Sequence, residues 1–369
     1  MKITDMKVYA YERNHSKPIS NGKYTYAKTQ LIVCRLITDE GIEGYGIVHD
    51  SIPIVTATLE MMRNLVIGQD PFNYERIWSN IYLPKVFGRK GFETRAISAI
   101  DIALWDIMGK VALRPIRQLL GGYHESIPAY IAGGYYEPGK GLKELQEEIR
   151  TNLSKGAKAI KMKIGGVSLS EDIERIDAVK DVLPNGVKLL VDANNAYNRI
   201  DALKIGRELD KRDIYWFEEP LSPDDLDGCA ELSRKLDTPI AIGENEYTRW
   251  GFKEIIDRNA AAVINADAAV LGGISEWKKV ADYAMASHIL VAPHGDQELH
   301  VHLVSAVPNG LIAEYYDTNL NELLSIMYKD HMVLDERGNI HAPDRPGLGI
   351  DLDFESLKPF LIYESPVNN

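Results

Sequence analysis

The second part of this 369-residue chain is built from short β-rich runs that alternate with amphipathic stretches. This alternation is typical of βα units around a parallel sheet. The runs recur at spacings of roughly 20–30 residues, as a (β/α)₈ barrel requires. From residue 125 onward the sequence therefore predicts an α/β protein of the TIM-barrel type. The predicted strands centre on PAYIAG, AIKMK, KLLVDA, IYWFEE, IAIGE, VINAD, ILVAPH and LIAEY.

The first part of the chain, residues 1–124, follows a different pattern. Two runs, Lys7 to Tyr11 and Thr29 to Thr38, are rich in β-branched and aromatic residues and predict a small sheet. From Pro53 to about Leu120 apolar residues recur three and four positions apart, as in amphipathic helices. We interpret this part as a separate α+β domain that ends near residue 125.

Two further segments complete the predicted organisation. The polar stretch HSKPISNGKYTY, residues 15–26, contains a proline and a glycine and is predicted to be a long loop placed to cover a site. After the barrel, residues 125–320, the tail 321–369 does not resemble another βα unit. Its run PDRPGLGIDLD is interpreted as a turn that leads into an edge strand, so we expect the tail to return to the first domain.

Composition excludes several classes of protein. The chain holds 42 Lys and Arg against 54 Asp and Glu, a formal net charge of -12, which argues against nucleic acid as a partner. Cys34 and Cys229 match no metal or redox spacing, and they are interpreted as packing residues in a reducing compartment. Without an apolar secretion segment at the start or a membrane-spanning run, the chain is expected to be cytoplasmic, with no membrane partner.

Polar side chains mark the ends of the predicted barrel strands, where barrel enzymes carry their chemistry. Asp192, Glu218 and Glu244 end three successive strands, so their carboxylates are expected to converge. Three like charges cannot share that volume alone. All-oxygen ligation without thiolate or imidazole favours Mg²⁺.

Acid–base groups occupy other strand ends. Lys161 and Lys163 are two positions apart on one strand, so their side chains point the same way, and we expect each ammonium, near a metal, to lower the pKa of the other. That shift would make a lysine a usable base near neutral pH. His294 ends the seventh strand and Asp267 the sixth, where the carboxylate could fix the imidazole tautomer.

At these residues the chain resembles the enolase superfamily, and within it the mandelate racemase subgroup. The resemblance covers nearly the whole chain, and its motifs together are highly specific in order and spacing. One departure is GYGIVHD, residues 44–50, where many relatives carry Gly-Trp-Gly-Glu. The matching motifs are KMK (Lys161, Lys163), VDANNAY (Asp192, Asn194), WFEEP (Glu218), GENE (Glu244), ADAAVLGG (Asp267), PH (His294), AEYY (Glu314), IDIALWDIMGK, LLGG and RPGLGIDLD.

The resemblance implies a (β/α)₇β barrel joined to an α+β capping domain made by the N-terminal region and the tail. It implies Mg²⁺ held by Asp192, Glu218 and Glu244, with the substrate carboxylate on the metal. Lys163 and His294 would act as acid or base on opposite faces, and Glu314 would hydrogen-bond the enediolate. Lys161 and Asp267 complete the predicted catalytic set.

The leading hypothesis is a lyase that removes the proton next to a carboxylate and dehydrates an acid sugar to a 2-keto-3-deoxy acid. The polar loop favours a polyol chain, and Asn194, Lys23, Tyr24 and Tyr26 are predicted to bind it. A racemase or epimerase of a 2-hydroxy acid is the alternative, because inversion also needs a base on each face. A cycloisomerase and a non-catalytic barrel are weaker alternatives. We also expect a homo-oligomer.

Overall fold

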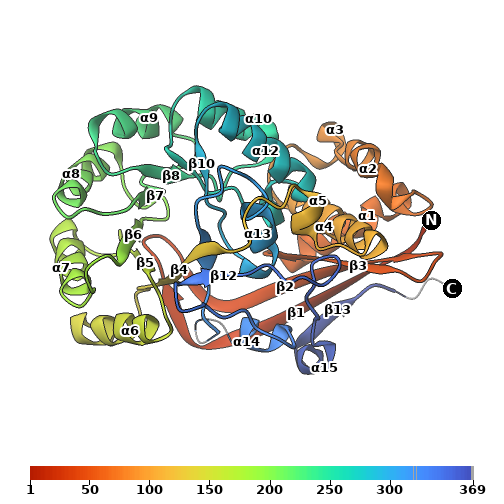
Figure 1. Ribbon diagram of the computed structural model, residues 1–369, viewed down its shortest axis with the longest axis horizontal. Helices are drawn as coiled ribbons and strands as arrows, with labels where there is room; N and C mark the ends of the chain where they lie inside the picture. Colours follow the sequence, from red (N-terminus) through yellow and green to blue (C-terminus); the bar gives the residue numbers. More distant parts are fainter. Residues whose placement is uncertain (319, 321, 367–369) are drawn as a thin grey trace.

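The parallel sheet predicted for the second part of the chain is present (Figure 1). The computed structural model describes residues 1–318, 320 and 322–366. In this described part, eight parallel strands follow the order β10-β9-β8-β7-β6-β5-β4-β11, and all the predicted barrel strands are confirmed. They are β4 (Ile127–Gly133), β5 (Ala159–Lys163), β6 (Lys188–Asp192), β7 (Phe217–Glu218), β8 (Ile240–Ile242), β9 (Val263–Ile264), β10 (Leu290–Val291) and β11 (Ala313–Tyr315).

Helices connect successive strands and lie on the outside of the sheet (Figure 1). Their ends carry ordinary capping chemistry: at the start of α7, Glu171 and Ser168 satisfy each other's backbone N–H groups in a capping box. The helices are α6 (Leu142–Ser154), α7 (Leu169–Lys180), α8 (Arg199–Asp210), α9 (Leu226–Lys235), α10 (Thr248–Asp257), α11 (Ala268–Leu271), α12 (Ile274–Ala286) and α13 (Gln297–Val304).

The parallel sheet closes on itself. The Val291 N–H of β10 donates to the Asn309 carbonyl at 3.0 Å, and the Leu311 N–H donates to the Val291 carbonyl at 2.9 Å. From there the chain enters β11, which pairs with β4. Because the strands are buried on both faces, they read as continuous apolar runs rather than as alternating ones. Closure brings the carboxyl ends of all these strands to one mouth.

A second, antiparallel sheet forms the capping domain, with the strand order β13-β1-β2-β3. Helices from residues 52–112 pack on one face of it and segments of the tail on the other, and the predicted α+β domain is confirmed. Its elements are β1 (Ile3–Ser20), β2 (Thr25–Thr38), β3 (Glu43–His49), α1 (Ile52–Val66), η1 (Pro71–Asn73), α2 (Tyr74–Ile81), α3 (Pro84–Phe87), α4 (Phe92–Ala112) and α5 (Ile116–Leu119).

The tail returns to the capping domain, but by a different segment from the one predicted. β13 (Leu361–Glu364) pairs with β1, whereas the run PDRPGLGIDLD forms no edge strand. Gly347 and Gly349 adopt φ angles of 74° and 64°, which break an extended strand. The remaining tail elements are α14 (Leu324–Met327), β12 (Asn339–Ile340), which pairs with the start of β4, α15 (Phe354–Leu357) and η2 (Lys358–Phe360).

The prediction of a long loop at residues 15–26 is wrong, because β1 and β2 continue through it as a hairpin. Ser20 pairs with Thr25, and the extra residues of β1 around Pro18 are absorbed in a bulge. The tip docks on the barrel, where the backbones of Ser20 and Tyr136 exchange two hydrogen bonds of 2.8 Å. The hairpin tip is held by backbone pairing with a distant segment, so its strands form without the apolar alternation from which strands are predicted. In Figure 1 these red strands extend toward β4–β6.

Helix α4 joins the two parts of the molecule. It is buried on nearly every side because it lies between the cap sheet and α11 and α12 of the barrel. The Trp105 indole N–H donates to the Ser275 hydroxyl at 2.9 Å, and Asp101 accepts from both the hydroxyl and the N–H of Ser275. None of the helices in the described residues combines the length and apolar character that crossing a bilayer requires.

Candidate active site

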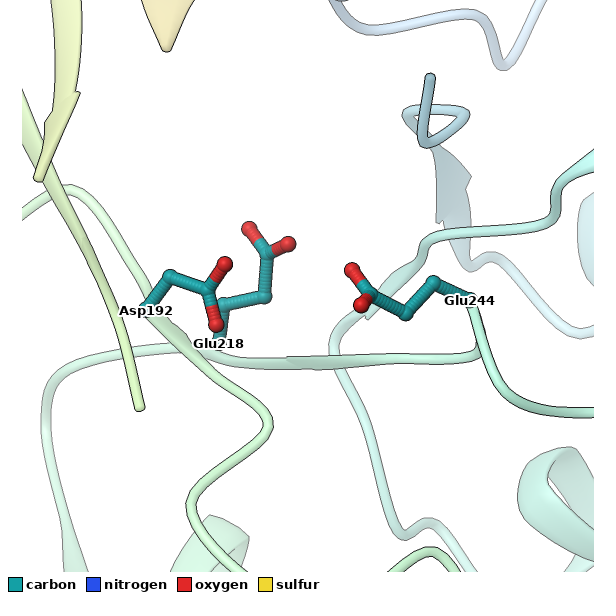
Figure 2. A group of neighbouring side chains, drawn as sticks. All are labelled: Asp192, Glu218 and Glu244. Atoms are coloured by element: carbon teal, nitrogen blue, oxygen red, sulfur yellow. The ribbon is translucent and has the colours of Figure 1, made fainter. Parts of the chain in front are cut away.

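Three carboxylates meet at the mouth of the barrel, as their strand positions predicted. Asp192 and Glu218 end β6 and β7, and Glu244 follows β8; their ligand oxygens all lie within 4.8 Å of one another. Figure 2 shows Glu244 pointing toward the other two. Among the described residues, no hydrogen-bond donor reaches the buried Oε2 of Glu244. An unsatisfied oxygen beside two further carboxylates fits a hard divalent cation.

Lys161 lies beneath this triad and is completely buried. Its ammonium is 2.7 Å from Glu218, 2.7 Å from Glu314 and 3.5 Å from Asp192. One ammonium does not balance these acids. Burial and the neighbouring carboxylates raise the pKa of Glu218 to about 8, although Lys161 lowers it. The charge imbalance is a second reason to expect a cation at the triad.

Lys163, on the same strand, forms an ion pair with Asp192 and lies 5.2 Å from the centre of the Tyr135 ring. Lys161 lowers the pKa of Lys163, as predicted, but the net shift of the Lys163 pKa in this structure is upward. Burial and Lys161 lower the pKa of Lys163, but Asp192, Tyr135 and Glu244 together raise it by more. A cation on the same carboxylates would oppose that increase.

On the other side of the triad, His294 and Asp267 form the predicted pair, with Nδ1 of His294 2.9 Å from Oδ2 of Asp267. The Nε2 atom of His294 lies 3.7 Å from Glu244 and 3.9 Å from Glu314. Burial lowers the pKa of His294, but these three carboxylates together raise it well above its usual value. The imidazolium is therefore the favoured form in this structure.

Sequence analysis missed the residue behind this pair. His300 on α13 accepts a hydrogen bond from the Ala268 N–H at 2.9 Å and lies 3.4 Å from Oδ1 of Asp267. Its Nδ1 faces the Gly295 carbonyl at 3.1 Å. These contacts hold the Asp267 turn against the His294 loop. A buried helical histidine gives no sequence pattern that distinguishes it from a packing residue.

Glu314 and Glu219 have different surroundings although both are buried carboxylates. Glu314, in the middle of β11, accepts from the Gly295 N–H at 2.8 Å and faces the triad through Lys161. Glu219 accepts from the side-chain amides of Asn195 and Asn245 at 2.9 Å and 2.8 Å. Glu219 thus ties together the turns that follow β6 and β8.

A cavity of about 460 Å³ opens between the barrel mouth and the cap, within the usual size range of small-molecule sites. Lys163, Glu244, Asp267 and His294 line it. Asn194 lines it too and donates to Oε1 of Glu244 at 3.3 Å. The strand-end residues are thus gathered around one volume.

The three substrate-binding residues predicted in the polar segment do not all face the cavity. Tyr26 lines the cavity, and its hydroxyl accepts from the Asn21 side-chain amide at 3.0 Å. Lys23 and Tyr24 do not line it; Tyr24 is half exposed, and the Lys23 ammonium lies 5.6 Å from the centre of its ring. Lys23 and Tyr24 lie in the turn before β2, where side chains do not alternate between two faces as they do along a strand. The sequence alone therefore did not show that only Tyr26 faces the cavity.

The cap also supplies residues that sequence analysis did not select. His49, at the end of β3, lines the cavity, and its Nε2 lies 3.0 Å from Asp296 in the loop after β10. Burial lowers the pKa of His49, but Asp296 reverses the effect and raises it to about 9. Arg95 and Asp50 line the same region and pair at 2.7 Å. The departure at GYGIVHD, which holds His49 and Asp50, was the available indication.

Comparison with known sequences agrees with both parts of this arrangement. Residues 3–121 match the family described as mandelate racemase / muconate lactonizing enzyme, N-terminal domain. Residues 144–357 match the family described as enolase C-terminal domain-like. The chain belongs to the enolase superfamily. Within that superfamily it falls in the mandelate racemase/muconate lactonizing subgroup, as the motifs predicted.

Several characterised members of this superfamily are similar over most of the chain. An arabinonate dehydratase of Saccharolobus solfataricus is 38% identical over 87% of this chain and 87% of its own length. A 3,6-anhydro-alpha-L-galactonate cycloisomerase of Streptomyces coelicolor is 34% identical over 89% of this chain and 90% of its own. The crystal structure of a racemase from Streptomyces coelicolor with bound magnesium has a TM-score of 0.92 at 31% identity, covering 98% of this chain and all of that one.

Proposed function

We propose that the protein is a Mg²⁺-dependent dehydratase of an acid sugar, which removes the proton next to the substrate carboxylate and releases a 2-keto-3-deoxy acid. The observation that carries this proposal is the arrangement around the triad. Lys163 contacts the triad at Asp192, whereas His294 approaches it at Glu244. A substrate carboxylate held between them would present its adjacent carbon to two proton-transfer groups.

The three carboxylates Asp192, Glu218 and Glu244 would hold Mg²⁺, which supplies positive charge where the substrate carboxylate becomes more negative on loss of the proton. The resident residues do the proton chemistry. Lys163 or His294 accepts the α-proton, and His294, charged and oriented by Asp267, is the better placed acid for the departing hydroxyl. Glu314 lies 3.9 Å from His294 and faces the same site.

Two observations support dehydration of a polyol acid over the other reactions of similar proteins. The cavity surface is polar where the cap covers it, with Tyr26, Thr29, Gln30 and His49 among its lining residues. A sugar chain offers hydroxyls that both donate and accept hydrogen bonds. The arabinonate dehydratase also has the highest identity of the three proteins compared above.

The test is a screen of mono- and dicarboxylate sugar acids for 2-keto acid release with Mg²⁺ present. Lys163→Ala and His294→Asn should each stop turnover. If one variant still exchanges the α-proton with D₂O, the proton-transfer residue that it retains is the first base. A wild type that interconverts two α-epimers without releasing a 2-keto acid would replace this proposal by the racemase alternative. Lys278→Ala, which removes an exposed pair with Asp282 on α12, serves as the matched control.

A further inference from the structure

We propose that the substrate is a monocarboxylate sugar acid, an aldonate, whose uncharged hydroxyl end lies against the cap, and that dicarboxylate sugar acids are selected against. This inference rests on the proposed function and names the substrate class of the same site. The geometry that carries it is the pairing of every cationic side chain lining the described cavity with an acid of this chain.

Two basic groups of the cap that line the cavity are paired across short distances. The Arg95 guanidinium lies 2.7 Å from Asp50, and the His49 imidazole lies 3.0 Å from Asp296. Arg95 is only 15% exposed, and the nearby Asp50 carboxylate offsets its charge. Neither group is left to neutralise a second substrate carboxylate.

The outer basic groups lead to the same conclusion. Lys28 pairs with Glu12 at 2.8 Å, and the same carboxylate accepts from Gln30 at 2.7 Å. His15 faces the Thr29 hydroxyl at 3.1 Å, and burial lowers its pKa, so it is neutral near pH 7. Within the described residues, no unpaired cation of the cap faces the cavity.

The barrel end of the cavity has no unpaired cation either. Of the basic groups that line it there, Lys163 pairs with Asp192, and His294 pairs with Asp267 at 2.9 Å. A first substrate carboxylate would gain the metal, but a second would lose its water without gaining a free cation.

A hydroxyl end has the opposite requirement. A sugar hydroxyl donates one hydrogen bond and accepts others, so it can bind to both members of an ion pair without breaking it. The pairs Arg95–Asp50 and His49–Asp296, with the hydroxyls of Tyr26 and Thr29, offer donors and acceptors on one surface. This surface therefore suits a neutral polyol.

The first experiment compares aldonates with the aldarates of equal length and configuration. We expect kcat/KM at least tenfold higher for the aldonate of each productive pair. Binding to Lys163→Ala, measured by calorimetry with Mg²⁺ present, should show the same preference in Kd. Turnover with equal or better use of the aldarate overturns this inference and leaves the proposed function intact. Absence of 2-keto acid release from every member overturns both.

The second experiment frees one cation. Asp50→Asn leaves Arg95 unpaired, and asparagine tolerates the φ angle of 96° at this position. We expect the aldonate-to-aldarate ratio of kcat/KM to fall at least tenfold. The control Asp351→Asn frees Arg345, which pairs with Asp351 at 2.6 Å outside the cavity, and should leave the ratio unchanged. An unchanged ratio in folded Asp50→Asn overturns the inference. If that variant fails to fold, Glu12→Gln, which frees Lys28, must lower the ratio instead.

Discussion

Replacing Lys161 by methionine removes a buried ammonium from the centre of the carboxylate cluster while keeping a side chain of similar length. The wild-type ammonium lies 2.7 Å from both Glu218 and Glu314 and 3.5 Å from Asp192. All four side chains are fully buried. The variant therefore leaves three carboxylates without their shared partner, and only a bound cation can replace it.

Two effects of opposite sign follow. Removing one partner of a buried ion pair costs about 3–5 kcal/mol, so the metal-free free energy of unfolding should fall by about that amount. The affinity for Mg²⁺ should rise, because Lys161 no longer repels the cation. Unit charges about 4 Å apart interact by about 4 kcal/mol at an effective dielectric constant of about 20. Relief of a quarter of that repulsion would lower the Kd for Mg²⁺ about fivefold.

Urea unfolding in EDTA and in Mg²⁺ measures the first effect, and calorimetric Mg²⁺ titration measures the second. Lys278→Met is the control, because Lys278 pairs with Asp282 on the exposed face of α12 and should change stability by less than about 1 kcal/mol. Weaker Mg²⁺ binding by Lys161→Met, with the fold intact, would refute the charge-balance reasoning. It would mean that Lys161 positions the ligands more than it repels the metal.

Three further predictions concern the hairpin, the cap and the acid–base pair. A Cβ at position 22 would lie 2.6 Å from the Ile164 carbonyl oxygen, so Gly22→Ala should displace the hairpin tip and lower kcat/KM at least tenfold in steady-state assays, with the circular dichroism spectrum unchanged. The folded pKa of His49, raised to about 9, stabilises the fold fully below its unfolded value near 6.5, and this stability is lost as the pH rises to about 9. His49→Gln should flatten that part of the urea-unfolding stability profile. Asp267→Asn removes a contact that raises the pKa of His294, so the ionisation of His294 in the pH–rate profile should shift downward and kcat should fall about 10²–10⁴-fold. Wild-type rates and profiles for any of these variants would contradict the corresponding prediction.

The barrel strands and the triad were predictable because local sequence carries their cause. Parallel strands buried on both faces must be apolar along their length, and a polar residue at the end of such a run is conspicuous. Asp192, Glu218 and Glu244 follow the runs LLV, WF and IAIG on successive strands, so their meeting follows from the topology. The same logic located Lys163, Asp267 and His294.

Other features depended on contacts between distant segments. The polar hairpin forms because the backbone of Ser20 pairs with Tyr136, and neither side chain announces this pairing. The net direction of the pKa shift of Lys163 depends on burial and on how closely Asp192, Tyr135 and Glu244 surround the ammonium. The spacing of the two lysines along a strand predicted that both side chains point the same way, but not how far Lys163 lies from each charged neighbour.

The sequence by itself determined the two-part architecture, the barrel and the residues at its mouth, because hydrophobic periodicity and strand-end chemistry are local properties. Only the tertiary structure decided which cap residues face them. His49 meets Asp296, and Arg95 meets Asp50, through the docking of the cap on the barrel and the turn after β3. Those pairings set the charge of the cavity, because each charged group interacts most strongly with its nearest partner. That partner lies on another segment of the chain or beyond a turn.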